Sequence, residues 1–355
     1  MIIIYVLLYN GMISRKAKIR FGIVGFGVAG RIHAEAIRNV YCAELVAICD
    51  ISERKREMAR RLYGVSVYAD LVNMADDDEV DAVSICLPHH LHASATITFL
   101  QMQKSVLCEK PLATSVADAQ LMIKAAQASN TMLGVVFQHR YEMINQFIRE
   151  EINQGLLGKI ISTSVSVKWQ KNPVYYRGWQ GNISESGGGV LINQAIHFID
   201  LAQWFNGGGK EVYGMSITAR DHLSVEDNAI ALVVYKNGAV GAIDCSTCAN
   251  PMMGSGLDII GSNYSIRTRD GEIVSWGRKS SNEIESLNEK FRQHGKFKPK
   301  QNHYGYGHAL QIQDFIQSIQ EVKQPLVTGE DGLSALKIVL AIIESAKTQE
   351  KVTLC

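Results

Sequence analysis

Two stretches of this chain carry side chains that could act on the hydroxyl group of an alcohol. Lys110 follows a short apolar segment and lies between an acid and a proline, and a proline biases the residue before it towards extended backbone. His197 lies in an apolar segment of helical spacing, residues 190–205. Oxidation of a secondary alcohol needs a base for the hydroxyl proton, and histidine suits that role because its ordinary pKa lies near neutrality. Lys110 would hold the alcohol oxygen and stabilise its developing negative charge.

Polar residues form a stripe along the helical segment that carries His197. Asn193, His197 and Asp200 fall on one face, since residues three or four positions apart are neighbours on a helix. Glycines at 187–189 precede the segment and permit a close approach of backbone. We therefore expect the stripe to face a site, with Asn193 orienting the substrate or the imidazole. Two roles are open for Asp200: a contact that steadies the imidazole of His197, or an ordinary structural role.

Residues 21–50 have the pattern of a dinucleotide-binding unit. An apolar strand runs into a turn with Gly25, Gly27 and Gly30, a helix follows, and a second apolar strand ends in Asp50. In such units the glycines allow the tight turn, the approach of a pyrophosphate and the packing of helix on strand, and the acid binds the ribose. Because a carboxylate repels a 2′-phosphate, Asp50 favours NAD over NADP as the cofactor.

Alternating helical and strand-like segments continue from residue 52 to residue 137. They predict a doubly wound parallel sheet of six strands, whose ligands bind beyond the carboxyl ends of the strands. The predicted cofactor contacts lie at those ends and in the glycine turn: Gly25, Phe26, Gly27, Val28, Ala29, Gly30, Asp50, Pro88, His89, His92, Glu109, Lys110 and Gln138. The histidines at 89–92 lack a cysteine or acidic cluster at ligand spacing, so we expect no metal site. Contact of Arg54 with a 2′-phosphate is the alternative that would favour NADP.

The composition changes after Tyr141. Strand-like segments with Asn-Gly and Asp-Gly hairpin turns predict a second α/β domain with a large, open, mostly antiparallel sheet. We expect a tail at 1–17, an NAD(P)-binding domain at 18–139 and a substrate-binding and oligomerisation domain at 140–355. The available helices cannot cover both faces of so broad a sheet, which predicts a homodimer or homotetramer paired through it.

Composition narrows the partners and the location. The 355 residues suggest about two domains, and 36 Lys and Arg against 35 Asp and Glu leave a net charge of +1, so no overall field favours nucleic acid or an anionic membrane. The apolar run at residues 2–9 is too short to span a bilayer, and Met12 is an alternative start of the natural chain. The seven cysteines are scattered among apolar segments, as in a reducing compartment, so we expect a cytoplasmic protein.

From about Lys18 onwards the chain resembles the Gfo/Idh/MocA oxidoreductases, a family named for glucose-fructose oxidoreductase and inositol dehydrogenase. The resemblance rests on the glycine turn, residues 88–92, Glu109-Lys110-Pro111, the glycine triplet followed by His197 and Asp200, and the ending 325–332. It implies a Rossmann domain joined to an α/β domain, and hydride transfer between NAD(P) and a sugar or polyol. In many members a lysine matching Lys110 and a histidine matching His197 act on the hydroxyl. An aspartate often stands where this chain has Asn193, which cannot take up a proton.

Within that family, residues 193–197 are similar to those of dehydrogenases that oxidise the 3-hydroxyl of nucleotide-linked N-acetylated sugars and uronates. The predicted substrate contacts, chosen for stacking and anion binding, are Arg140, Lys168, Trp169, Arg177, Asn193 and His197. They predict a substrate with a carboxylate or diphosphate, and lining of a domain interface is the alternative for most of them. Two other functions stay open: a glycosidase that uses bound NAD for transient oxidation and elimination, and a dinucleotide sensor, which would need neither Lys110 nor His197.

Overall fold

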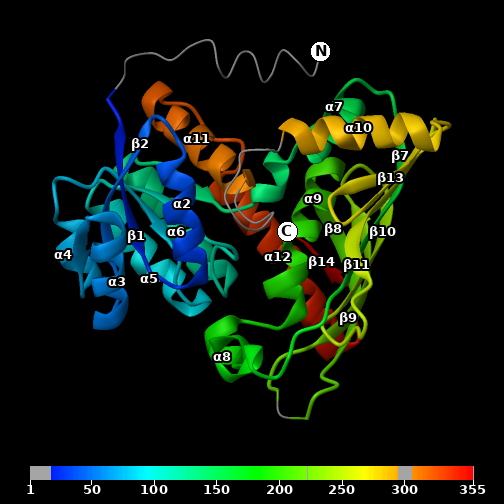
Figure 1. Ribbon diagram of the computed structural model, residues 1–355. Helices are drawn as coiled ribbons and strands as arrows, with labels where there is room; N and C mark the ends of the chain where they lie inside the picture. The colour runs from blue at the N-terminus through cyan, green and yellow to red at the C-terminus, as the bar shows by residue number, and fades with distance from the viewer. Residues whose placement is uncertain (1–16, 222, 295–305, 355) are drawn as a thin grey trace.

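The computed structural model describes residues 17–221, 223–294 and 306–354 of the chain. Two lobes stand side by side, each built on one β-sheet, and helices α9 (Ile196–Asn206) and α12 (Gly329–Thr348) lie between the two sheets (Figure 1). The predicted tail at 1–17 lies, except for its last residue, outside the described residues. No helix in the described part is long and apolar enough to cross a membrane.

The first lobe holds a six-stranded parallel sheet in the order β3-β2-β1-β4-β5-β6. Its strands are β1 (Ile19–Val24), β2 (Ala43–Cys49), β3 (Ser66–Tyr68), β4 (Ala82–Ile85), β5 (Ser105–Cys108) and β6 (Leu133–Val135). The helices that connect them are α2 (Val28–Arg38), α3 (Glu53–Tyr63), α4 (Leu71–Ala75), α5 (His92–Gln101) and α6 (Val116–Ser129). The strand order reverses between β1 and β4, the point at which doubly wound sheets bind their ligands. The predicted six-stranded Rossmann sheet is confirmed.

Local chemistry sets the elements of this lobe. β4 and β5 are buried along their whole length because helices cover both faces of the parallel sheet. α6 begins where the Ser115 hydroxyl accepts a hydrogen bond from the Asp118 amide at 3.1 Å, which satisfies a free N–H group of the first turn. α11 (Tyr306–Glu321) comes late in the chain but packs beside α2, and the ring centres of Phe21 and Phe315 lie 6.4 Å apart.

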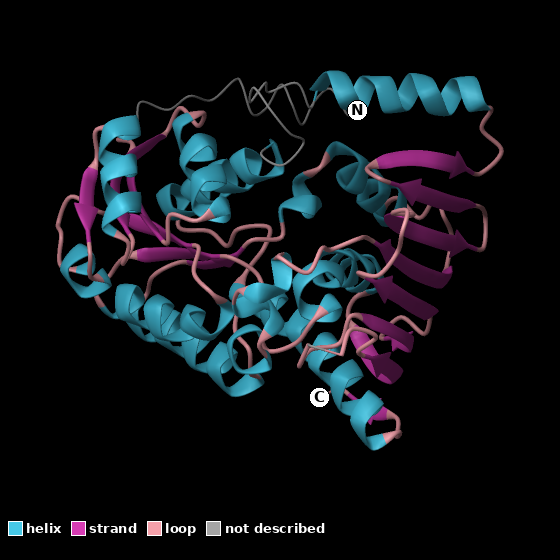
Figure 2. Ribbon diagram, turned by 60° about the horizontal axis from the view of Figure 1, so that its bottom comes forward, coloured by secondary structure: helices cyan, strands magenta, loops and turns pink. Residues whose placement is uncertain are grey.

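The second lobe holds an eight-stranded sheet in the order β13-β12-β11-β7-β10-β9-β8-β14, and Figure 2 shows its strands in succession along one side of the molecule. The strands are β7 (Ile160–Lys168), β8 (Gly209–Ile217), β9 (Asn228–Tyr235), β10 (Val240–Ser246), β11 (Gly254–Gly261), β12 (Ser265–Arg269), β13 (Glu272–Trp276) and β14 (Val352–Thr353). Helices α7 (Met143–Asn153), α8 (Ile183–Ser186) and α10 (Ser281–His294) complete the lobe. β7 and β10 pair in parallel and the other described neighbours are antiparallel, so the predicted mostly antiparallel sheet is confirmed.

The two faces of this sheet differ. α9 and α12 cover the face turned towards the first lobe, and the apolar core beneath them runs on into that lobe. On the opposite face, apolar side chains such as Met215, Ile230 and Leu232 are between 60% and 69% exposed. The strands therefore carry apolar side chains on both faces, although α9 and α12 cover only one.

Candidate active site

Lys110 lies just beyond the carboxyl end of β5. Its Nζ donates a hydrogen bond of 2.7 Å to the main-chain oxygen of Asn193, so this side chain joins the two lobes. Burial lowers the pKa of Lys110 below its ordinary value of 10.5, and the negative charge of Glu109 opposes that shift. The structure thus places an acid beside an amine that is largely removed from water.

Two histidines lie close to the carboxylate of Glu109. Neither was predicted from the sequence, because neither follows the carboxyl end of a strand. The Oε1 of Glu109 lies 3.2 Å from His33 Nε2 and 3.9 Å from His308 Nε2. Burial raises the pKa of Glu109, but the hydrogen bond and charge of His33, with the charge of His308, overcome this effect and lower the pKa to about 2. The ligand atoms of these three residues lie within 4.8 Å of one another, a donor set that could also hold a metal ion. We interpret the group as the support that keeps Glu109 ionised beside Lys110.

His197 lies at the start of α9 and is buried. Ring centres of His139 and Phe137 lie 5.0 and 6.0 Å from that of His197. Burial lowers the pKa of His197 well below 6.5, and the charge of Lys110 lowers it further. The imidazole is therefore neutral at physiological pH and can accept a proton. Its Nδ1 has no hydrogen-bond partner among the described residues.

The segment that carries Asn193 begins with a π-helical turn, Leu191–Ala195, where its spacing had predicted a regular helix. The carboxylate of Glu226 fixes this start by accepting hydrogen bonds from the amides of Gly189 and Leu191 at 2.8 and 3.1 Å. A Cβ on Gly189 would lie 1.7 Å from the main-chain oxygen of Glu226. The glycine triplet thus allows the main chain to pack closely, as expected, but its contact is with the protein itself.

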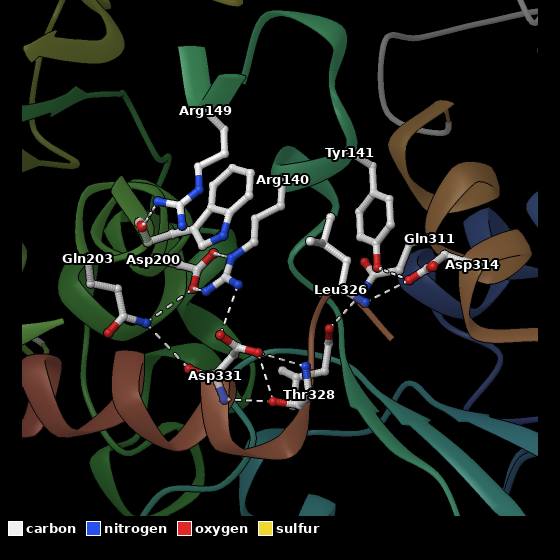
Figure 3. A network of polar contacts seen from close by, with 12 residues as sticks. Arg140, Tyr141, Arg149, Asp200, Gln203, Gln311, Asp314, Leu326, Thr328 and Asp331 are labelled. Carbon is white, nitrogen blue, oxygen red and sulfur yellow. Dashed lines mark hydrogen bonds and ion pairs between the residues drawn. The ribbon is translucent and has the colours of Figure 1, made fainter. Parts of the chain in front are cut away.

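Arg140 lies in an internal ion-pair cluster (Figure 3) and not at a substrate surface. Its guanidinium donates to the two carboxylate oxygens of Asp200 at 2.7 and 2.6 Å and to Asp331 at 2.9 Å, and only 2% of the residue is exposed. These ion pairs replace the predicted substrate contact of Arg140. They also show that Asp200 has the structural role, because its carboxylate is held by Arg140 and not by the imidazole of His197.

The remaining predicted substrate contacts lie around the second sheet. Lys168 ends β7 and pairs with the carboxylate of Asp244. Its neighbour Val167 is buried in the core, so Lys168 points to the opposite, open face of the sheet and away from the expected substrate side. Trp169 packs on α9, where its ring centre lies 6.5 Å from that of Phe198, the residue after His197. Arg177 is exposed at the end of a short helical turn.

The glycine turn has the shape that a pyrophosphate needs. Gly25 has a φ of +94°, a conformation that side chains disfavour. A Cβ on Gly30 would lie 2.0 Å from the main-chain oxygen of Gly25, so α2 packs on the turn only without a side chain there. A Cβ on Gly27 would meet no atom within 4 Å. The space over Gly27, at the N-terminus of α2, therefore fits the phosphates of a dinucleotide.

Asp50 follows β2 and lies beside the same turn. Its Oδ2 accepts hydrogen bonds from the Phe26 amide at 2.8 Å and from Lys55 Nζ at 3.1 Å, and its Oδ1 accepts from the Ser52 amide at 2.9 Å. The turn itself thus orients the carboxylate. The cation that contacts Asp50 is Lys55, whereas the sequence pattern had drawn attention to Arg54.

Two of the predicted cofactor contacts after β4 and β6 make hydrogen bonds within the protein. A ring nitrogen of His89 lies 2.8 Å from the main-chain oxygen of Ser186 in the second lobe, and one of His92 lies 2.7 Å from that of Pro111. Gln138 is buried, and its Oε1 has no hydrogen-bond partner in the described part of the chain. Cofactor contacts by these residues stay predictions.

This arrangement defines a class of protein. The turn leaves space for a pyrophosphate, and beyond the strand ends of the same sheet the charge of an ammonium acts on a neutral imidazole, as in two-domain dehydrogenases that use a dinucleotide. Within that class the chain belongs to the Gfo/Idh/MocA oxidoreductase family. Residues 19–137 match the family's NAD-binding Rossmann fold, and residues 149–354 match its C-terminal alpha/beta domain. The family resemblance is therefore confirmed.

Similar proteins act on sugars and polyols. The chain is 30% identical to an inositol 2-dehydrogenase of Rubrobacter xylanophilus over 279 residues, which cover 76% of this chain and 77% of that protein. It is 26% identical to the myo-inositol 2-dehydrogenase of Thermotoga maritima over 347 residues, with coverage of 94% and 98%. It matches the structure of the WlbA dehydrogenase of Bordetella pertussis in complex with NADH and UDP-GlcNAcA, with a TM-score of 0.88, 29% identity and coverage of 96% and 99%.

Gly27→Ala should separate cofactor binding from folding. We expect the variant to keep the Tm of the natural protein, because the added Cβ meets no atom, and to bind NADH at least about tenfold more weakly, because the methyl group blocks the pyrophosphate. Gly30→Ala is the matched control and should lower the Tm, since its Cβ clashes within the protein. Fluorescence titration and thermal melts measure the two effects. Unchanged NADH affinity in Gly27→Ala would contradict this account of the turn.

Proposed function

We propose that this protein transfers a hydride between NAD and a ring carbon of a sugar that carries a carboxylate, such as a nucleotide-linked uronate. The observation that carries the proposal is the contact of Lys110 with the main-chain oxygen of Asn193, which brings an ammonium near the neutral His197 at the edge of the NAD-binding sheet. The likeness to a protein solved with UDP-GlcNAcA supports an acidic nucleotide sugar. The inositol dehydrogenases among the relatives make a neutral polyol the competing substrate.

The proposed chemistry divides the work between two side chains. NAD, held over the glycine turn and beside Asp50, would supply the acceptor for the hydride of the carbinol carbon. His197, neutral because burial depresses its pKa, takes the hydroxyl proton, and the alcohol oxygen becomes the ketone oxygen. Lys110 donates a hydrogen bond to that oxygen and stabilises its negative charge as the C–H bond breaks, with Glu109 as counter-ion. Asn193, whose amide nitrogen donates to the Gly188 oxygen at 3.3 Å, orients the substrate.

Lys110→Ala and His197→Ala should each lower kcat at least about 100-fold and leave the Kd of NADH within about threefold, because both groups act mainly in the transition state. In the natural enzyme, kcat/KM for oxidation should fall in acid only below pH 6.5, since the pKa of His197 is lowered from that value. The same kcat/KM should fall in alkali at a pH below 10.5, since the pKa of Lys110 is lowered from that value. Stopped-flow rates across pH test this, with Lys110→Arg as the control that keeps the charge. Near-normal turnover in both alanine variants would refute the mechanism.

The carboxylate of Asp50 is proposed to select NAD, by binding the ribose hydroxyls and repelling a 2′-phosphate, although Lys55 lies 3.1 Å away. NADH should therefore bind more tightly than NADPH, and Asp50→Asn should weaken that preference about tenfold or more. Lys55→Met is the matched control and should keep the preference. Fluorescence titration with both cofactors measures it. NADPH binding as tight as NADH binding in the natural protein would count against Asp50 as the selector.

We also propose that the protein forms a homodimer or homotetramer through the open face of the second sheet, where Met215, Ile230 and Leu232 are exposed. Sedimentation should give a mass that is a multiple of the 39.2 kDa chain. Leu232→Glu should shift it to a monomer, because two buried carboxylates would repel and desolvate at the interface. Leu121→Glu, at an exposed leucine of α6, is the control and should leave the assembly intact. A natural protein that stays monomeric at micromolar concentration would exclude the pairing.

A further inference from the structure

Lys171 is a cation that the predicted substrate contacts did not include. It lies three residues after β7, and its main chain is anchored to the lobe: its amide donates to the Thr247 oxygen at 3.0 Å, and its oxygen accepts from the Arg220 guanidinium at 3.0 Å. Its Nζ lies 5.5 Å from the ring centre of Trp169 and 5.2 Å from that of Tyr175. The main chain and two aromatic rings therefore fix the position of the ammonium.

The ammonium of Lys171 has no acidic partner in the described part of the chain. Among the residues that the structure describes, none places a carboxylate oxygen within 4 Å of its Nζ. Lys168, by contrast, pairs with Asp244. Burial lowers the pKa of Lys171 below its ordinary value of 10.5, so the group is partly removed from water without a counter-charge. Such a cation favours an anionic ligand, because the ligand supplies the charge and the hydrogen bonds that the protein does not.

A short chain of contacts links Lys171 to the proposed site of hydride transfer. The ring of Tyr175 lies against the ammonium, and the Tyr175 hydroxyl accepts a hydrogen bond from the Gln194 amide at 2.8 Å. Gln194 follows Asn193, whose main-chain oxygen accepts the hydrogen bond of Lys110. Burial is the main cause of the lowered pKa of Lys110, and the charge of Lys171 contributes to it. The charge of Lys171 therefore acts on Lys110, and the chain of contacts connects Lys171 to the segment that Lys110 contacts.

We propose that Lys171 binds the carboxylate of the sugar ring that is oxidised, and so sets the preference for an acidic sugar. The inference rests on the proposed function, since it assumes that the reacting hydroxyl lies at Lys110. A ring carboxylate is one bond from the ring, within reach of a side chain that neighbours the group holding the ring hydroxyl. A diphosphate extends away from the ring and suits this position less well.

The test compares UDP-GlcNAcA with UDP-GlcNAc, whose sugar is neutral because a hydroxymethyl group replaces the carboxylate. Lys171→Met removes the charge and keeps most of the side-chain volume. It should lower kcat/KM for the acidic sugar about 10- to 100-fold and leave that for the neutral sugar within about threefold. Lys171→Arg should keep most of the preference. Lys168→Met, at the lysine already paired with Asp244, is the matched control and should change neither value. Thermal melts confirm that each variant is folded.

Each outcome decides between distinct claims. An equal loss on both sugars would make Lys171 a structural residue and overturn the inference, as would a natural enzyme that prefers the neutral sugar. Calorimetric binding to the protein with NAD separates the inference from the proposed function. If UDP-GlcNAcA binds but is not oxidised, the proposed function fails, and a loss of this binding in Lys171→Met still supports the carboxylate site. If Lys171→Met weakens the binding of UDP alone to the same degree, Lys171 contacts the diphosphate and the proposal is wrong.

Discussion

The contact between Lys110 and the main-chain oxygen of Asn193 is the constraint on which the site depends. At 2.7 Å it joins the strand ends of the first sheet to the π-helical turn of the second lobe. An ammonium that is partly removed from water is costly unless a nearby charge compensates it. Glu109 compensates here because the hydrogen bond and charge of His33, with the charge of His308, lower the pKa of Glu109 to about 2 against the effect of burial. The lysine is thereby held as a charged donor at the position where the proposed mechanism needs one.

Two further carboxylates, the half-buried Glu226 and the buried Asp200, hold the helix that presents His197. Glu226 accepts hydrogen bonds from main-chain amides at the start of this segment, and Asp200 pairs with Arg140 three residues after the histidine. Loss of one partner of a buried ion pair costs about 3–5 kcal/mol, so the pair of Asp200 with Arg140 holds this helix in place, and the hydrogen bonds of Glu226 hold its start. An apolar helix can therefore carry a polar stripe, because its charged members have partners inside the protein.

The first sheet could be predicted from the sequence because glycine spacing and Asp50 report local geometry, and the strand-end rule singled out Lys110, which the structure places against the second lobe. The charged residues of the second half could not be assigned in the same way. The sequence shows the charge of Arg140 but not its distant partner Asp200. The face on which Lys168 lies depends on the register of β7, and a shift of one residue reverses it. The π-helical turn has no local sequence signal and depends on a carboxylate from another loop.

Isotope transfer tests the central claim most directly, that this chain moves a hydride from a ring carbon of an acidic sugar to NAD. The natural protein would be incubated with NAD and UDP-GlcNAcA deuterated at the carbon of the 3-hydroxyl, and the cofactor would be released by denaturation and examined by mass spectrometry. The account predicts deuterium in the reduced nicotinamide in proportion to the ketone formed, and its loss in Lys110→Ala. Deuterium that stays in an unchanged sugar, or release of a free sugar with no net NADH, would contradict it.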